Sequence, residues 1–307
     1  MNDLSSLINR LDPDPQVRGK QFEPVAKWFF ENSPEYSSKI KKVWHWKDWP
    51  GRPDKEPDIG IDLVAQTHDG DHWAIQVKCY AESTTVTKAD MDSFLAASSK
   101  PQYTYRLLIT TTNSIAPNAL KAMKDQSIDV GTIIRADLDQ AGLDWPASPK
   151  SLTSKKYKRK TLRPHQKKAV RDVAKGFEDN ARGQMIMACG TGKTIAALGV
   201  HEQLASKRNL VLVPSLALLK QTLSEWTANT AVPFEFLAVC SDDTVVGDDA
   251  TISSTRDLGV PVTTDPKEIA SPLGQSLAFS LRPSRSHPIG PASFRTPQPC
   301  PRGGCRN

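Results

Sequence analysis

A glycine-rich loop in the middle of the chain has the residue types that bind a nucleoside triphosphate. A predicted strand at 185–187 leads into it, and a predicted helix begins at Lys193. Glycines let the backbone approach phosphate closely, and the free N–H groups at a helix start point at the anion. Lys193 can reach the β and γ phosphates, and the Thr194 hydroxyl can ligate Mg²⁺. The predicted ATP-binding residues of this loop are Gly190, Thr191, Gly192, Lys193 and Thr194.

A second set of polar residues, Asp62, Gln76 and Lys78, has the types that a metal-dependent phosphodiesterase needs. Gln76 and Lys78 lie two residues apart on a predicted strand, so their side chains face the same side. A hairpin can bring Asp62, at the end of the preceding predicted strand, beside them. We expect Asp62 to bind Mg²⁺ and the Gln76 side-chain carbonyl to act as a neutral ligand or orienting group. Lys78 is expected to stabilise charge on the attacked phosphate or to help activate water.

Two alternatives stay open for this second set. Asp58 follows Pro57 and is a rival to Asp62 as the principal metal ligand. We prefer Asp62 because it follows Gly60-Ile61 and lies within a predicted strand. The other alternative is an amphipathic hairpin whose Asp, Gln and Lys side chains simply face solvent.

Hydrophobic periodicity predicts an α/β layer in the first half of the chain. Pro24 fits only near the first turn of the first predicted helix, which favours a later start than Arg18. The turn His68-Asp69-Gly70-Asp71 predicts a hairpin. The predicted strands are 43–46, 59–65, 73–77, 106–110 and 130–134, and the predicted helices are 18–32, 88–98 and 117–124.

The second half alternates strands and helices, which predicts a doubly wound parallel sheet. A Trp-Pro segment and a basic run between about 143 and 160 mark the predicted domain boundary. The predicted strands are 185–187, 210–213 and 236–239, and the predicted helices are 164–180, 193–205 and 217–226.

Composition favours a soluble protein of the reducing cytoplasm. The 307 residues suffice for two domains, and the sequence has neither a long apolar run nor a basic-then-apolar N-terminus. Five scattered cysteines argue against a disulfide framework. The formal charge is +6, but residues 272–307 hold five Arg and no Asp, Glu or Lys, so the rest carries about +1. The basic run 155–160 is either a solvated linker or a contact to the DNA backbone.

The nucleotide loop and its flanks resemble the superfamily 2 helicases and translocases. Met187 occupies the first glycine position of the general phosphate-loop pattern, as in the variant form that those motors use. Leu162-Arg163-Pro164-His165-Gln166 resembles their adenine-reading motif, and the resemblance implies that Gln166 contacts adenine. The segment 213–219 resembles their next motif, which touches the DNA backbone.

The first half resembles the Mrr-like branch of the PD-(D/E)xK nucleases, in which glutamine often replaces the second acid. The steps Gly60-Ile61-Asp62 and Gln76-Val77-Lys78 carry this likeness. Glu23 matches the extra acidic residue of that branch and is a further candidate catalytic residue.

Residues 15 to 271 together resemble the N-terminal part of type I-like single-polypeptide restriction enzymes. The resemblance implies a restriction-endonuclease-like mixed sheet flanked by helices, followed by an incomplete RecA-like parallel α/β domain. It also implies Mg²⁺ and ATP as cofactors and double-stranded DNA as partner. The expected divisions are a nuclease domain at 1–145, a basic linker at 146–161, an ATP-binding domain at 162–271 and a disordered tail at 272–307.

The second half lacks a motif that such motors require. We find no Asp-Glu pair after a strand to hold magnesium and position water, so we expect weak nucleotide binding and no ATP hydrolysis. The composition changes abruptly after Ser271, and a shifted reading frame is preferred to a natural disordered tail. The expected function is a Mg²⁺-dependent DNA endonuclease, coupled to an ATP-driven translocase in a longer enzyme. The alternative is a non-catalytic DNA-binding helicase fragment or remnant.

Overall fold

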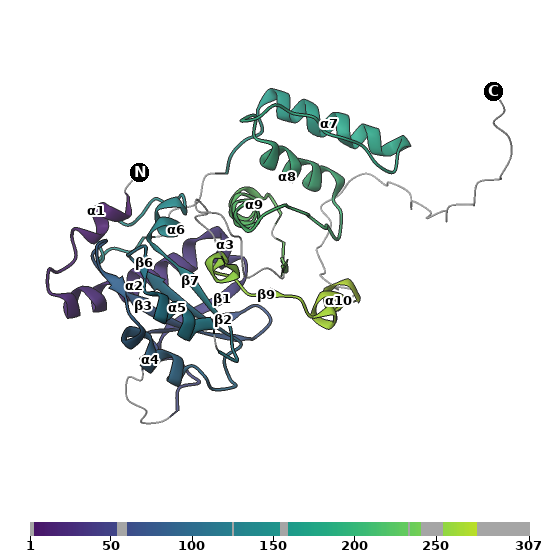
Figure 1. The fold of residues 1–307 in the computed structure, drawn as a ribbon. Coiled ribbons are helices and arrows are strands. Elements are labelled where there is room, and N and C mark those ends of the chain that lie inside the picture. The colour runs from purple at the N-terminus through teal and green to yellow at the C-terminus, as the bar shows by residue number, and fades with distance from the viewer. Residues whose placement is uncertain are drawn as a thin grey trace, which may run out of the picture. The chain divides into compact units, whose positions relative to one another are not determined.

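The strands of the first half form one mixed five-stranded sheet in a computed structural model of the chain (Figure 1). The structure describes residues 3–53, 60–124, 126–153, 159–232, 234–240 and 254–274. Asp58, the basic residues 155–158 and the tail from 275 lie outside the described residues. Residues 1–273 group into one unit and residues 274–307 into a second.

The sheet has the order β1-β2-β3-β5-β7. β1, β2 and β3 are antiparallel neighbours, whereas β3, β5 and β7 are parallel. Antiparallel neighbours need only a tight turn, and parallel neighbours need a crossover, which the intervening helices provide. The strands are β1 (Ile40–His45), β2 (Leu63–Thr67), β3 (His72–Lys78), β5 (Tyr105–Thr110) and β7 (Val130–Ile133).

Helices cover both faces of this sheet. α2 (Pro15–Asn32) packs its buried aromatic residues against one face, together with Leu63, Ile75 and Val77. α4 (Lys88–Ala97) and α5 (Pro117–Lys124) cover the face that carries Val64 and Ala74. The predicted mixed sheet flanked by helices is confirmed. The shorter elements are α1 (Leu4–Ile8), α3 (Pro34–Ser37), η1 (Trp46–Asp48), β4 (Thr85–Val86), β6 (Ser114–Ile115) and α6 (Arg135–Gln140).

The expectation of a later start for the first long helix is wrong. α2 begins at Pro15, because the Asp14 side chain accepts hydrogen bonds from Gln16 N (2.9 Å) and Val17 N (3.0 Å) and caps the helix. Pro24 lies inside α2. The lost backbone hydrogen bond is offset by burial of the neighbouring apolar side chains, several of which are fully buried.

The described part of the second half contains three helices that pack on one another and a small strand pair, together with shorter elements. α7 packs on α8, and α8 packs on α9. β8 and β9 pair in parallel. No helix in the described part of the chain is long and apolar enough to span a bilayer. The elements are α7 (Pro164–Asp179), α8 (Lys193–Leu204), α9 (Leu216–Asn229), β8 (Ala238–Val239), η2 (Thr255–Leu258), β9 (Val262–Thr263) and α10 (Pro266–Gly274).

Two predicted strands of the second half, 185–187 and 210–213, do not form strands in the structure. Ile186, Leu210 and Leu212 are 89%, 85% and 82% exposed. A parallel strand is stable only when neighbours supply hydrogen bonds on its edges and apolar cover on its faces. Neither segment gains such neighbours within the described residues, so the helices form around the loop without the sheet.

A half-buried carboxylate, Glu35 of α3, lies where α3 packs on α9. Its Oε1 is buried and has no hydrogen-bond partner among the described residues. Burial raises the Glu35 pKa to about 7, although the Lys220 charge opposes the shift and the Asp137 charge adds to it. This carboxylate is therefore held protonated at pH values where a free glutamate is ionised.

The raised pKa of Glu35 predicts a pH-dependent stability. Below about pH 4.5 the side chain is neutral in both states, and between pH 4.5 and 7 only the unfolded chain ionises it. The free energy of unfolding should therefore fall across this window, by about 1 to 3 kcal/mol in total. Urea unfolding at several pH values measures the slope, and Glu35→Gln should flatten it. Glu31→Gln, on the more exposed surface of α2, should leave the slope unchanged, and an equal flattening there would contradict the assignment.

Candidate functional site

The register of β2 and β3 brings Asp62 opposite Gln76. Leu63 pairs with Ile75, so Asp62, one residue before β2, faces the next position of β3. The Asp62 backbone N–H donates to Ile75 O at 3.0 Å. Val77 N donates to Asp62 Oδ2 at 2.6 Å, and the Gln76 side-chain amide donates to the same oxygen. The structure thus brings together two of the four predicted nuclease residues, with Asp62 just outside the strand.

The side-chain carbonyl oxygen of Gln76 lacks a hydrogen-bond partner among the described residues. Gln76 is only 5% exposed, and its Oε1 is buried without a hydrogen-bond partner among the described residues. Leaving a buried acceptor unpaired costs about 1–3 kcal/mol, so such an atom needs a partner. A hard cation that prefers oxygen ligands would supply one.

The donor set of Asp62 and Gln76 fits Mg²⁺ better than a soft metal. Both offer oxygen atoms, which Mg²⁺ prefers, and Mg²⁺ usually retains several water ligands beside one or two carboxylates. No group of three His, Cys, Asp or Glu side chains suited to a metal is present within the part of the chain that the structure describes.

Lys78, the last residue of β3, is half-buried and faces the same side of the sheet as Gln76. Its charge reaches Asp90 on α4, a carboxylate that the sequence patterns do not indicate. Burial raises the pKa of Asp90, but hydrogen bonds from Thr87 and Tyr80 and the charge of Lys78 together lower it further than burial raises it. Tyr80 Oη donates to Asp90 Oδ1 at 2.7 Å. Lys78 therefore shares a sheet face with Gln76 and lies within electrostatic reach of an ionised carboxylate, Asp90.

Glu23, the fourth predicted residue, is placed on α2, which packs on the sheet face opposite to the side chain of Gln76. Its carboxylate forms an ion pair with Lys20 Nζ at 3.1 Å. It also acts on His45, whose pKa is lowered by burial and raised in part by the Glu23 charge. The interactions of Glu23 are thus with Lys20 and His45.

The nucleotide loop has the backbone conformation that its glycines predict. Gly190 and Gly192 have φ values of +75° and +78°, in the region that other residues adopt only with strain. Gly192 directly precedes α8, which begins at Lys193. Lys193 Nζ donates to the carbonyls of Met187 (3.4 Å) and Ala188 (3.3 Å), so its ammonium already sits over the loop.

The Gln166 side chain is hydrogen-bonded to the nucleotide loop itself. It is 4% exposed, and its Nε2 donates to Thr191 O (2.9 Å) and Gly192 O (3.2 Å). Its Oε1 accepts from Arg163 N at 2.8 Å. A Cβ on Gly192 would lie 2.5 Å from Gln166 Nε2, so this contact itself requires glycine. Gln166 therefore fixes the loop to the start of α7.

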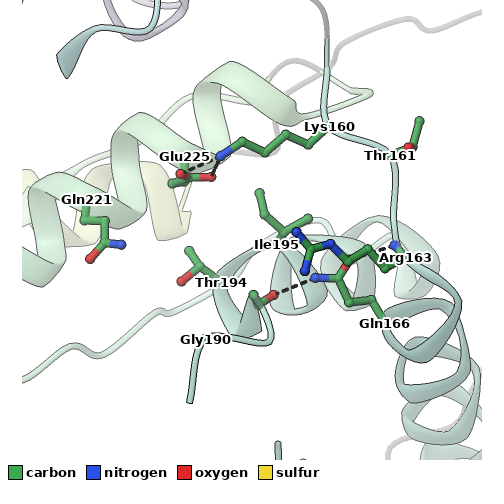
Figure 2. A pocket seen from close by; sticks show the side chains of 10 residues that line it. Lys160, Thr161, Arg163, Gln166, Gly190, Thr194, Ile195, Gln221 and Glu225 are labelled. Atoms are coloured by element: carbon green, nitrogen blue, oxygen red, sulfur yellow. Dashed lines mark hydrogen bonds and ion pairs between the residues drawn. The ribbon is translucent and has the colours of Figure 1, made fainter. Parts of the chain in front are cut away.

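A pocket of about 440 Å³ opens beside the loop and α8 (Figure 2). Gly190, Gly192, Thr194 and Gln166 line it, as predicted for a nucleotide site. Thr191 and Lys193 belong to the same loop but do not line the pocket. The other lining residues are Lys160, Thr161, Arg163, Ile195, Gln221 and Glu225. The sequence patterns do not indicate Gln221 and Glu225, because spacing says nothing about which distant helix packs there.

Two family models match consecutive parts of the chain. Residues 31–155 match the family described as "Restriction endonuclease", and residues 159–265 match the family described as "Type III restriction enzyme, res subunit". A putative DNA 3'-5' helicase Rad25 of Halobacterium salinarum is 41% identical over 71 residues, which is 23% of this chain and 11% of that protein.

A solved structure resembles the greater part of the chain. The ATP-dependent Type ISP restriction-modification enzyme LlaBIII bound to DNA matches with a TM-score of 0.69 and 30% identity, over 82% of this chain. This chain spans 16% of that one. The MspJI restriction endonuclease in complex with a 27-mer oligonucleotide matches 39% of this chain and 27% of its own, at 16% identity. Its TM-score is 0.29. The family matches and the first structure confirm the resemblance seen in the sequence.

The hydrogen bonds of Asp62 predict that this residue stabilises the fold, in addition to any role in binding a ligand. Asp62→Ala leaves Val77 N–H and the Gln76 amide without their acceptor, and should lower the free energy of unfolding by about 1–3 kcal/mol. Asp62→Asn keeps an acceptor oxygen and should cost less. Urea unfolding of both variants measures the difference, and equal costs would show that the carboxylate contacts do not support the hairpin.

Proposed function

Because the chain carries a restriction-endonuclease domain followed by a helicase-like domain, we propose that it hydrolyses DNA phosphodiesters with Mg²⁺ at Asp62, Gln76 and Lys78. The observation that carries the proposal is the Asp62–Gln76 pair, whose buried Gln76 Oε1 has no partner among the described residues. Double-stranded DNA is the proposed substrate, and a restriction system is the proposed setting.

Each of the three residues has a separate task in this proposal. Asp62 offers an anionic oxygen, held in position by Val77 N–H and by the Gln76 amide. Gln76 offers a neutral oxygen, so the pair attracts a cation without adding a second negative charge to repel the DNA phosphate. Mg²⁺, when bound, would lower the pKa of a bound water and polarise the phosphate. Lys78 would stabilise the negative charge that develops on the attacked phosphate.

The second half is proposed to bind ATP with magnesium. The loop N–H groups and Lys193 would bind the phosphates, and Thr194 would contact the metal. Lys193 would exchange its bonds to the Met187 and Ala188 carbonyls for bonds to phosphate oxygens. Gln166 retains acceptor capacity on Oε1, since a carbonyl oxygen has two lone pairs and Arg163 N–H uses one of them. Adenine would lie in the pocket beside Gln166 and Arg163.

Nicking of supercoiled plasmid by the full chain tests the nuclease proposal. With Mg²⁺ the chain should nick DNA, and Lys78→Ala should reduce the rate by about 100-fold or more, because a preorganised charge at the transition state is lost. Asp62→Asn should reduce it similarly, since the carboxylate charge disappears while the hydrogen-bond acceptor remains. Lys88→Ala is the matched control, because Lys88 is an exposed lysine of α4 paired with Asp92.

Two outcomes would contradict the nuclease proposal. Equal nicking by the wild type and by Lys78→Ala would assign the activity to a contaminant or to another site. DNA binding without any cleavage would favour the non-catalytic DNA-binding alternative.

Fluorescence titration with a labelled ADP tests the nucleotide site. Lys193→Ala should weaken Mg·ADP binding by about 10- to 100-fold, because hydrogen bonds to charged groups contribute roughly 1.5–3 kcal/mol. Lys168→Ala removes an exposed lysine of α7 that pairs with Asp172, and should leave the affinity unchanged. Equal affinity in the wild type and in Lys193→Ala would remove the nucleotide from this loop.

A further inference from the structure

Two faces of helix α9 have different neighbours. One side packs on the first half of the chain, and the other lines the nucleotide pocket. The two rows of residues follow helical spacing, since positions four apart lie on one face. Leu216 and Lys220 belong to the first row, and Gln221 and Glu225 belong to the second.

The first side of α9 is anchored in the core of the nuclease half. Leu216 is 6% exposed and belongs to the same apolar cluster as Ile75 and Val77 of β3. Leu219 and Leu223 also pack against this cluster. The strand that carries Gln76 and Lys78 therefore shares its hydrophobic core with α9.

Lys220 adds a polar anchor beside this apolar contact. Its ammonium donates to Asp137 Oδ1 of α6 (2.5 Å) and to the backbone carbonyl of Asp257. The side chains of Lys220 and Asp137 are only 18% and 21% exposed. The buried carboxylate of Glu35 on α3 also feels the charge of Lys220. Lys220 thus joins α9 to α6 through an ion pair with Asp137 and lies within electrostatic reach of Glu35 on α3.

The C-terminal half of α9 is tied to the nucleotide loop and to the linker. Trp226 Nε1 donates to Thr194 O at 3.0 Å. Glu225 accepts from Lys160 Nζ at 2.8 and 2.9 Å, at the edge of the pocket (Figure 2). Asn229 Oδ1 accepts from Lys160 N at 2.8 Å. A ligand that enters the pocket would meet Glu225, Gln221 and Lys160, and would displace or strengthen these contacts.

We propose that α9 couples nucleotide binding to the nuclease half, with Lys220 as the positioning residue on the nuclease side. This inference rests on the proposed nucleotide site. Lys220 and Glu225 are five residues apart, about 7.5 Å along one continuous helix. A displacement of α9 at the pocket therefore moves Lys220 relative to Asp137. The coupling acts through position, because Lys220 holds α9 to α6 by its contact with Asp137.

Hydrogen exchange of the full chain, with and without saturating Mg·ADP, tests this coupling. In the wild type, Mg·ADP should slow exchange in α8 and also in segment 130–140, by about 5-fold or more in the latter. In Lys220→Met the slowing in α8 should persist and the slowing in 130–140 should disappear. Lys220→Arg keeps the charge and should behave as the wild type. Lys168→Met, which removes an exposed lysine of α7 paired with Asp172, is the matched control and should also behave as the wild type.

Asp137→Asn removes the partner charge from the other side, and serves if Lys220→Met does not fold. It should likewise abolish the slowing in 130–140. Slowing in α8 without slowing in 130–140 in the wild type would overturn the coupling while leaving the nucleotide site intact. Equal slowing in 130–140 in the wild type and in Lys220→Met or Asp137→Asn would also overturn it. No slowing in α8 would overturn the nucleotide site itself, and the coupling with it.

Discussion

The register between β2 and β3 is the constraint on which the nuclease half depends. Because Leu63 pairs with Ile75, the odd positions of both strands enter the core beneath α2, and the even positions face α4. The same register places Asp62 opposite Gln76 at the end of the hairpin. A slip of one residue would exchange the two faces, moving Gln76 into the core beneath α2 and turning Ile75 and Val77 toward α4. The hydrophobic core therefore holds the polar pair in place, although it contributes no atom to that pair.

Local signals were sufficient to predict most of this half from the sequence. The turn at 68–71 and the alternation on both sides predict the β2–β3 hairpin, and the strand positions agree within a few residues. The juxtaposition of Asp62 and Gln76 follows from that hairpin alone. Pro24 misled the prediction for α2, because the capping by Asp14 and the burial of a whole helix face outweigh one lost hydrogen bond. Asp90 beside Lys78 could not be predicted, since it depends on how α4 crosses the sheet.

Local sequence patterns predict the helices of the second half better than its strands. Its helices are predictable from their own periodicity, whereas segments 185–187 and 210–213 are apolar but unpaired in the described structure. A parallel strand takes its stability from neighbours that are distant in sequence, so its composition alone does not fix its state. The pocket residues likewise divide into those that a sequence motif indicates and those that distant packing brings in. The glycines and Thr194 of the pocket are readable as a motif, but Gln221 and Glu225 reach it only through the packing of α9.

The small number of protein oxygens at Asp62 and Gln76 has a consequence for how a metal would bind. Mg²⁺ requires six ligands in near-octahedral geometry, and this pair offers few of them and a single negative charge. The remaining positions would be filled by water, by oxygens of the DNA phosphate or by Asp58, which lies outside the described residues. Charge has the same effect, because a DNA phosphate beside the site supplies the negative charge that Gln76 lacks. Metal and DNA should therefore each increase the affinity for the other, since coupling between two ligands is reciprocal. A site of this composition would hold its metal weakly until DNA arrives, which ties the hydrolytic chemistry to the presence of the substrate.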